Sequence, residues 1–339
     1  MRKFIYLIIS VCFITFSNNV CAESASGTII MEFDLSSHNS DKEANLWVPY
    51  PTTNKNQTIS NIRVDGNFSS SGVYTESKFK NPILYSHWDA DTKSRKLKFI
   101  FDVTRQEIIT ESLPKKESAW DPADYALYLS PSRLGPIDGE VKKLADKITA
   151  GQTTILGKAK AIYNWTCENT YRNPKTRGCG IGDVNQLLKD PGGKCTDISS
   201  IFVALARAAN VPAREIMGIR QGKKDGQDIS KWQHCWAEFY LPGHGWVPVD
   251  PADVRKMMLK QNLSLCDIKT AKYREYFWAR LDPYRIKLGE GKDLDLNPPQ
   301  TGEPVNYLMY PFAQIGDETL DWLDPETFKY KIEFNLKDK

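Results

Sequence analysis

The segment around Cys195 constrains the fold of this chain more than any other. A Gly192-Gly193 pair interrupts regular structure directly before it. After it, apolar residues recur at the spacing of a helix with one buried face, namely Ile198, Ile201, Phe202, Leu205 and Ala209. Asn210-Val211-Pro212 ends this pattern. We therefore expect Cys195 at the start of a helix, where unpaired backbone N–H groups favour a thiolate and can bind an oxyanion.

Two later segments are typical of neighbouring strands, and they carry a histidine and an aspartate. Alternation along the first segment places four residues on the same face as His234, namely Trp232, Trp236, Glu238 and Tyr240. If Tyr240 pairs with Trp246, then Asp250 is the diagonal neighbour of His234 on that face, within side-chain reach. A register shifted by one residue would send Asp250 to the opposite face. We therefore predict that Asp250 and His234 share a face, either with Leu241 to Gly245 as the connecting loop or with a bulge that has the same effect.

A cysteine, a histidine and an aspartate in this order indicate a thiol nucleophile, its base and the group that orients the base. The thiolate is the reactive form, and a free thiol with a pKa of roughly 8.5 is mostly protonated at neutral pH. A helix N-terminus and a neighbouring imidazolium would both lower the pKa of Cys195. The three residues therefore predict an acyl-transfer site made of Cys195, His234 and Asp250.

These motifs resemble the transglutaminase-like superfamily. The matching segments are Gly193-Lys194-Cys195-Thr196-Asp197, Ala208-Ala209-Asn210-Val211-Pro212-Ala213-Arg214, His234-Cys235-Trp236-Ala237-Glu238 and Gly245-Trp246-Val247-Pro248-Val249-Asp250-Pro251, with Ala161-Ile162-Tyr163-Asn164-Trp165 and Asn169-Thr170-Tyr171 upstream. They span roughly Gly139 to Val254, about a third of the chain. The resemblance implies a papain-like core, with Cys195 as nucleophile, His234 as base and Asp250 as orienting group. It also implies the activity of a transglutaminase, a cysteine peptidase or a peptide amidase.

The resemblance further implies a second oxyanion donor, often an aromatic or amide side chain upstream of the cysteine. The candidates are Tyr171, Trp165 and Gln186. We expect Tyr171, because it follows a predicted helix and can present its O–H to a cleft; packing of Tyr171 and Trp165 in the core is the alternative. The expected residues of the substrate cleft are Trp165, Trp232, Trp236 and Glu238, with a structural role as the alternative for Glu238.

Several other kinds of site are excluded. The Gly178 to Gly182 segment follows no predicted strand and lacks a Gly-Lys-Ser/Thr ending, so it is no phosphate-binding loop. Cys167, Cys179 and Cys235 lack the paired short spacings of a zinc site. We therefore expect neither a metal nor an organic cofactor. The formal net charge is only +3, and no basic stripe with interleaved aromatic residues occurs, which argues against a nucleic-acid partner.

The N-terminal residues predict a signal peptide. Arg2 and Lys3 precede an apolar run from Phe4 to Phe16, and Val20-Cys21-Ala22 offers small residues for cleavage after Ala22. The apolar run is short for a membrane span, and no later segment approaches one. We expect a mature protein outside the cytoplasm, periplasmic or secreted, with no transmembrane segment after cleavage. The sequence leaves its oligomeric state open.

An extracytoplasmic location would permit disulfides. Without Cys12 and Cys21, and with Cys195 as a free nucleophile, four of the seven cysteines are available, namely Cys167, Cys179, Cys235 and Cys266. They allow three complete pairings, between which the sequence does not choose. We favour Cys167 with Cys179, because a helix end and the loop after it can meet, and buried thiols are the alternative.

The 339 residues predict two folded units in an α+β protein. We predict a signal peptide at 1–22, an all-β sandwich at 23–110, a linker at 111–136, a papain-like transglutaminase core of helices packed on an antiparallel sheet at 137–255, and an extension at 256–339 that completes the core or walls the cleft. Short alternating runs between turn-rich segments indicate the sandwich. Helices are expected at Val141–Ala150, Ala159–Asn169 and around Leu265–Ala279, and a final strand near Tyr330–Asn335.

The expected function is extracytoplasmic acyl transfer. The Cys195 thiolate would attack a peptide or side-chain amide of a peptide or protein substrate and form a thioester acyl-enzyme. Hydrolysis is favoured over amine cross-linking, because water is the default acceptor. The alternative is an inactive or latent protein that binds a peptide or an envelope glycan in the same cleft.

Overall fold

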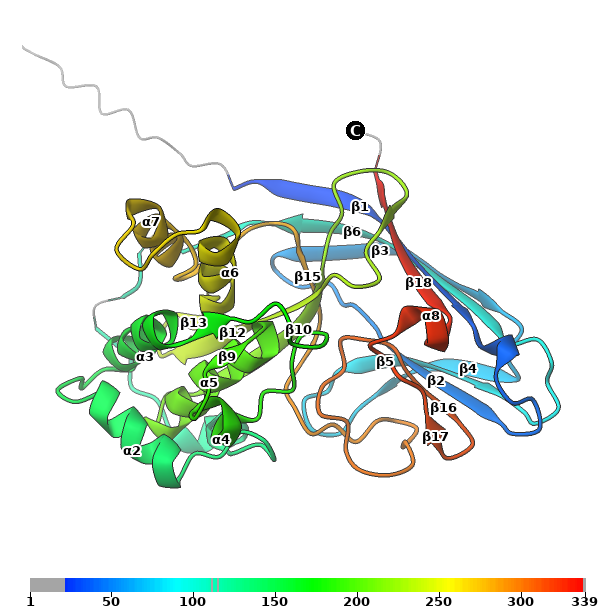
Figure 1. The fold of residues 1–339 in the computed structure, drawn as a ribbon, viewed down its shortest axis with the longest axis horizontal. Helices are drawn as coiled ribbons and strands as arrows, with labels where there is room; N and C mark the ends of the chain where they lie inside the picture. The colour runs from blue at the N-terminus through cyan, green and yellow to red at the C-terminus, as the bar shows by residue number, and fades with distance from the viewer. Residues whose placement is uncertain (1–21, 111, 115, 338–339) are drawn as a thin grey trace, which may run out of the picture.

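The computed structural model describes residues 22–110, 112–114 and 116–337. Residues 1–21 of the predicted signal peptide lie outside this range, so the expected cleavage after Ala22 stays a prediction. Within the described residues, no helix has the length and apolar character needed to span a bilayer. Figure 1 shows a helix-rich part on the left and a β-rich part on the right, so the α+β fold class is confirmed.

A four-stranded antiparallel sheet forms the centre of the helix-rich part. Its strand order is β13-β12-β10-β15. The bounds are β10 (Ala213–Arg220), β12 (Gln233–Leu241), β13 (Gly245–Val249) and β15 (Arg285–Glu290). Helix α5 (Cys195–Ala208) packs against β10 and β12 on one side and contacts helices on the other. All residues of α5 are buried as a result, so the helix holds Cys195 on a rigid support.

The bounds of the other helices are α1 (Ala126–Leu129), α2 (Gly139–Ile148), α3 (Ile155–Asn169), α4 (Val184–Leu187), α6 (Pro251–Gln261), α7 (Ile268–Tyr276) and α8 (Pro325–Phe328), with 3₁₀ turns at Leu35–Ser37 and Pro122–Tyr125. Helices α2, α3, α4, α6 and α7 lie in the helix-rich part with α5, whereas α8 lies beside β18 (Tyr330–Leu336) in the β-rich part (Figure 1). Helices α2, α3 and α7 lie where the sequence predicts helices. Helix α6 was not predicted. Short strand pairs fix the connecting segments: β8 (Tyr171–Arg172) with β9 (Gly192–Gly193), and β7 (Ile108–Ile109) with β14 (Arg280–Leu281).

Two five-stranded sheets form the β-rich part. Their orders are β11-β18-β1-β6-β3 and β17-β16-β2-β5-β4. The bounds are β1 (Ser24–Asp34), β2 (Ala44–Pro49), β3 (Gln57–Gly66), β4 (Ser70–Thr75), β5 (Pro82–Trp88), β6 (Lys96–Gln106), β11 (Gln227–Asp228), β16 (Phe312–Ile315), β17 (Glu318–Thr319) and β18 (Tyr330–Leu336). Alternate residues of the long strands, such as Ile29, Phe101 and Phe334, are buried between the sheets.

The C-terminal residues contribute strands to both the helix-rich part and the sandwich. Strand β15 completes the sheet next to α5, as one expectation for this extension had it. Strands β16 and β18, however, pair with β2 and β1 and complete the sandwich. The sandwich is therefore discontinuous in sequence, and its strands are not confined to the predicted range of 23–110.

The cysteines are unpaired in this structure. All five cysteines of the described residues are free thiols, and only Cys266 is exposed. Cys167 faces the helical core from α3, whereas Cys179 lies in a loop beside the start of α5. The Cys167–Cys179 disulfide is thus a wrong expectation, because the two side chains belong to different buried clusters.

Candidate active site

Cys195 is the first residue of α5, as predicted. Its side chain lines a cleft of about 730 Å³, although only 2% of the residue is exposed. The first N–H groups of a helix have no partner inside the helix. Among the described residues, no hydrogen bond satisfies the backbone N–H of Cys195. This N–H can therefore serve an oxyanion.

Asp197 fixes the backbone around Cys195. Its Oδ2 accepts the N–H of Lys194 at 3.0 Å and its Oδ1 accepts the N–H of Gly182 at 2.9 Å. Two glycines allow this close approach: a Cβ at Gly180 would lie 1.9 Å from Asp197 Oδ2, and one at Gly193 would lie 2.3 Å from Asp197 Cβ. Gly180 also has a φ of +89°, which residues with a side chain rarely adopt. Gly180 and Gly193 thus leave the space that Asp197 needs to fix the start of α5.

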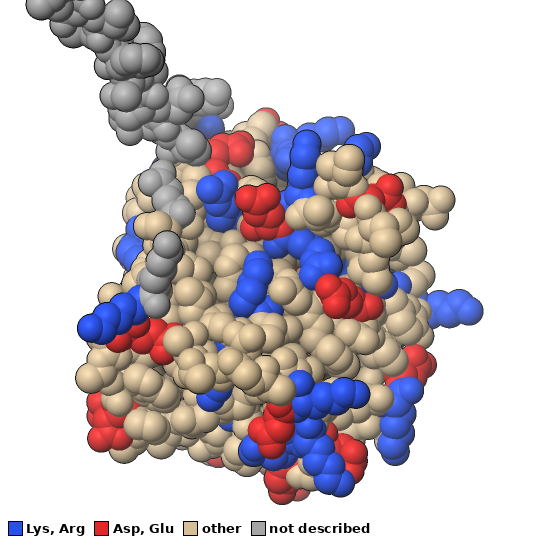
Figure 2. Space-filling model, turned by 90° about the vertical axis from the view of Figure 1, so that its left-hand side faces the viewer, with Lys and Arg blue, Asp and Glu red and all other residues tan. Residues whose placement is uncertain are grey.

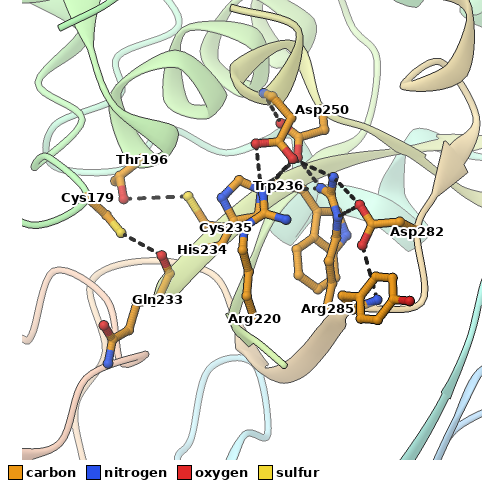
Figure 3. Close-up of polar contacts among 12 residues, drawn as sticks. Cys179, Thr196, Arg220, Gln233, His234, Cys235, Trp236, Asp250, Asp282 and Arg285 are labelled. Carbon is orange, nitrogen blue, oxygen red and sulfur yellow. Dashed lines mark hydrogen bonds and ion pairs between the residues drawn. The ribbon is translucent and has the colours of Figure 1, made fainter. Parts of the chain in front are cut away.

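The strand register brings His234 and Asp250 together. Tyr240 pairs with Trp246, as predicted, in the β12–β13 hairpin. His234 Nε2 lies 2.7 Å from Asp250 Oδ2, and both residues are buried (Figure 3). An N–H on Nε2 that donates to this carboxylate leaves Nδ1 unprotonated in the neutral ring. The ring therefore has one nitrogen held by Asp250 and the other free for a proton.

The Cys195 thiol has a strongly perturbed environment. Hydrogen bonds from the thiols of Cys179 and Cys235, followed by the neighbouring His234, lower the pKa of Cys195 well below its ordinary value, although burial opposes this. The pKa of Cys179 is raised, first by its hydrogen bond to Cys195 and then by burial. The pKa of Cys235 is raised by burial and by Cys195. These opposite shifts favour the negative charge on Cys195 over its two neighbours, whose thiols lie within hydrogen-bond distance of Gln233 O (Cys179, 3.3 Å) and Thr196 Oγ1 (Cys235, 3.5 Å).

Sequence reasoning missed Arg285, which joins the triad carboxylate to two others. Its Nη2 lies 2.7 Å from Asp253 Oδ2 and 2.9 Å from Asp282 Oδ2. Its Nη1 contacts Asp250 Oδ2, the oxygen that also holds His234 (Figure 3). Arg285 is completely buried, and the three carboxylates raise its pKa against the effect of burial. The segment Asp282-Pro283-Tyr284-Arg285 contains only one of the three partners, Asp282, whereas Asp250 and Asp253 lie well before it in the chain, so no local sign of this role exists in the sequence.

The same network disfavours a metal ion at this site. The side chains of His234, Asp250 and Asp253 offer ligand atoms within 4.8 Å of one another. The guanidinium of Arg285 already contacts both carboxylates. A cation among these ligands would therefore be repelled by a buried, permanently charged arginine.

Four side chains predicted for the oxyanion site or the cleft do not line the cleft. Tyr171 is 40% exposed, and its O–H donates to Asp190 Oδ1 at 2.8 Å. Trp165 packs against the helical core, and Trp236 is buried against Ile216 and Leu281. Glu238 pairs with Arg214 at 2.7 Å, the structural alternative. The third oxyanion candidate, Gln186, is exposed on α4 and also lies off the cleft wall.

Trp232 alone of the predicted cleft residues lines the cleft. It also lines a second groove of about 970 Å³. Ser230, Lys231 and Tyr330 are shared by the two as well. The cleft at Cys195 therefore continues towards the sandwich, along β1, β6 and β18.

The cleft wall is rich in cations that the sequence analysis did not single out. Seven basic residues line it, namely Arg172, Lys194, Arg220, Lys223, Lys231, Lys256 and Lys260. Only two acidic residues do so, Asp253 and Asp282. The basic residues come from separate segments of the chain, so no local charge run could have indicated them.

Comparisons with known proteins agree with this geometry. The model of the transglutaminase-like superfamily matches residues 142–251. An uncharacterized protein of Haemophilus influenzae is 37% identical over 317 residues, which cover 86% of each chain. A protein-glutamine gamma-glutamyltransferase of Pseudomonas aeruginosa is 24% identical over 177 residues, 48% of this chain but only 26% of that protein.

A solved structure of similar fold is that of a candidate cysteine protease from Cytophaga hutchinsonii. It has a TM-score of 0.54 at 16% identity and covers 92% of this chain and 98% of its own. At this identity the likeness concerns the fold alone. The family match covers the residues that position Cys195, His234 and Asp250. The chain belongs to the transglutaminase-like superfamily.

Proposed function

We propose that this protein is an extracytoplasmic thiol acyl-transfer enzyme that hydrolyses an amide of a peptide or protein substrate. One observation carries the proposal: Cys195 starts a buried helix beside His234, and His234 is held by Asp250 at 2.7 Å. The proposed location rests on the predicted signal peptide, and the substrate class rests on the amide chemistry of the superfamily.

In the first half-reaction, the Cys195 thiolate forms a bond to the amide carbon. The carbonyl oxygen becomes an oxyanion that the backbone N–H of Cys195 can stabilise. His234 then donates a proton to the leaving nitrogen, the C–N bond breaks, and a thioester remains. In the second half-reaction, His234 takes a proton from water, the hydroxide attacks the thioester, and the acid and the free thiolate are released.

A buried ion-pair network supports Asp250 behind His234. Three carboxylates, Asp250, Asp253 and Asp282, face two guanidiniums, Arg220 and Arg285. Burial would raise the pKa of Asp253 and Asp282, but the arginines lower both below the usual value. A thiolate paired with an imidazolium is the reactive form of a cysteine nucleophile.

The test is product analysis of amide substrates with and without a primary amine. The wild-type protein and Cys195→Ala would be incubated with a peptide mixture, and products would be identified by mass spectrometry. We expect hydrolysis products from the wild type and none from Cys195→Ala. Products that persist in Cys195→Ala would exclude this nucleophile, and amine adducts in excess of hydrolysis would make the protein a cross-linking enzyme.

A further inference from the structure

We propose that the cleft at Cys195 recognises an acidic peptide, whose carboxylates are held by cleft cations that form no ion pair within the described part of the chain. The choice of an amide-containing ligand rests on the proposed function. The preference for negative charge rests on the composition of the cleft wall. These two parts have separate tests.

The cleft carries uncompensated positive charge. Both of its carboxylates are already ion-paired, because Asp253 pairs with Arg220 and Arg285 and Asp282 pairs with Arg285. Of the seven basic residues on the wall, Arg220 alone forms an ion pair within the described part of the chain. Six cations remain for a ligand, and an anionic group is the ligand that they would attract.

Three elements contribute cations to the cleft wall that Cys195 also lines. Lys194 precedes Cys195, and Arg172 on β8 pairs in register with Gly193 on β9. Lys256 and Lys260 are four residues apart on α6 and so share one helix face. The positive charge thus comes from several parts of the wall of one cleft.

Two of these side chains could gain from a bound carboxylate. Arg172 Nη1 is buried and has no hydrogen-bond partner among the described residues. The pKa of Lys256 is lowered by burial and then by Arg220; Asp253 opposes this shift, and Arg172 and Lys260 add to it. A carboxylate bound between these cations would supply the missing acceptor and reduce their mutual repulsion.

Two buried amides can bind the backbone of a peptide. Gln221 is 2% exposed and Gln233 is 6% exposed, and both line the cleft. Neither the amide oxygen nor the amide nitrogen of either side chain has a partner among the described residues. Each carboxamide offers a donor and an acceptor, which is the complement of one peptide group. Leaving such groups unpaired is costly, so a ligand with matching groups gains their hydrogen bonds.

The size of the site fits this ligand. A cleft of about 730 Å³ that continues into a second groove can hold an extended segment of several residues. On the left-hand face of the molecule, side chains of both signs are interspersed around a largely uncharged centre (Figure 2).

The test measures binding in the absence of turnover. Cys195→Ala would be titrated by calorimetry with two peptides of the same length, one containing Glu and Asp and the other the matching Gln and Asn. We expect the acidic peptide to bind about tenfold more tightly or better, with the difference shrinking as ionic strength rises. Adding Lys256→Gln and Lys260→Gln should remove most of the difference. Adding Lys142→Gln and Lys143→Gln instead, at two exposed positions of α2, should leave the difference in affinity unchanged.

Three results would overturn the inference. Equal affinity for both peptides would deny a charge preference, and a preference that survives the α6 substitutions would place the site elsewhere. Tighter binding of an anionic polysaccharide than of the acidic peptide would replace the peptide by a glycan. The reactivity of Cys195 in the wild type is measured separately, so an unreactive thiol would refute the proposed function without touching this binding result.

Discussion

Asp250 has two roles, one for each of its carboxylate oxygens. Oδ2 holds His234 Nε2 at 2.7 Å, whereas Oδ1 accepts the N–H of Asp253 at 2.8 Å and caps helix α6. The residue that orients the base is thereby fixed by the helix that follows it. The same helix supplies Lys256 and Lys260 to the cleft.

Asp250→Asn separates these two roles. Asparagine caps a helix about as well as aspartate, so α6 should stay formed. The amide cannot stabilise an imidazolium, and we expect the rate of amide hydrolysis to fall by roughly 10²–10⁴-fold. Steady-state kinetics and far-ultraviolet circular dichroism measure the two effects. A variant that retains nearly full activity would contradict the role of Asp250.

Arg285→Met tests the buried charge network. It leaves Asp250, Asp253 and Asp282 without their shared cation, and breaking a buried pair costs roughly 3–5 kcal/mol of unfolding free energy. In the wild type, the lowered pKa of Asp253 gives stability that is complete above the ordinary carboxyl value of 3.8 and is lost as pH falls through the lower folded value.

The variant lacks Arg285, which is one cause of the lowered pKa of Asp253, so its carboxylates take up protons at a higher pH. Without the arginine, protonation of these carboxylates also costs the folded state less unfolding free energy. We therefore expect the stability gap between wild type and Arg285→Met to be smaller at about pH 4 than at about pH 7, as measured by urea unfolding. A gap of equal size at both pH values would mean that packing, rather than charge, explains the loss.

At the scale of elements, the start of α5 depends on the close contact between Gly180 and Asp197. Gly180→Ala would place a Cβ 1.9 Å from Asp197 Oδ2 at a residue with positive φ. Gly151→Ala is the matched control, because Gly151 also has a positive φ of +78° but no atom within 4 Å of its added Cβ. Positive φ alone costs roughly 1–2 kcal/mol in either variant.

We expect Gly180→Ala to lose more unfolding free energy than Gly151→Ala, and only Gly180→Ala to slow the alkylation of Cys195. Thermal unfolding and peptide mapping measure the two effects. Equal losses of unfolding free energy and equal alkylation of Cys195 in both variants would show that the start of α5 does not depend on the position of Asp197.

The sequence predicted the elements whose signals are local. The apolar spacing after Cys195 indicated α5, and alternation with a short Gly-rich loop indicated the Tyr240–Trp246 register. Helix α6 was not predicted, although an aspartate N-cap followed by proline is a local signal that starts helices. Trp236 was placed in the cleft because it shares a strand face with His234, but β14 covers that part of the face.

At the scale of the whole molecule, the last strand completes the first sheet. Strand β18 lies between β1 and β11, with Phe334 opposite Ile29. The tail also supplies Tyr310 and Tyr330 to the cleft wall. The sandwich and the cleft therefore depend on the same C-terminal residues.

Removing residues 330–339 should destabilise the N-terminal sandwich. The deletion exposes the core around three buried side chains, Tyr330, Ile332 and Phe334, which together contribute about 5–9 kcal/mol. We expect an unfolded or aggregated β-rich part, visible in circular dichroism and limited proteolysis. A control chain that ends after Leu336 should fold. A native sandwich in the longer deletion would show that β18 is dispensable.

Long-range pairing explains what the sequence did not reveal at this scale. Alternation marks a segment as a strand, but it does not say which strand lies beside it. The pairing of β1 with β18 joins opposite ends of the described chain, and the cationic cleft likewise assembles from separate segments. Both features exist only in the folded molecule.

The central claim is that Cys195 is a thiolate activated by His234. The most direct measurement is alkylation by iodoacetamide as a function of pH, with each modified cysteine located by mass spectrometry. Exposed Cys266 is a reference in the same molecule, and Cys167, whose pKa burial raises to about 12, should stay unmodified. We predict that Cys195 reacts well below pH 8, roughly the range where a free thiol is still protonated, and that His234→Ala abolishes this reactivity. A Cys195 that titrates together with Cys266, or that is unaffected by His234→Ala, would contradict the account.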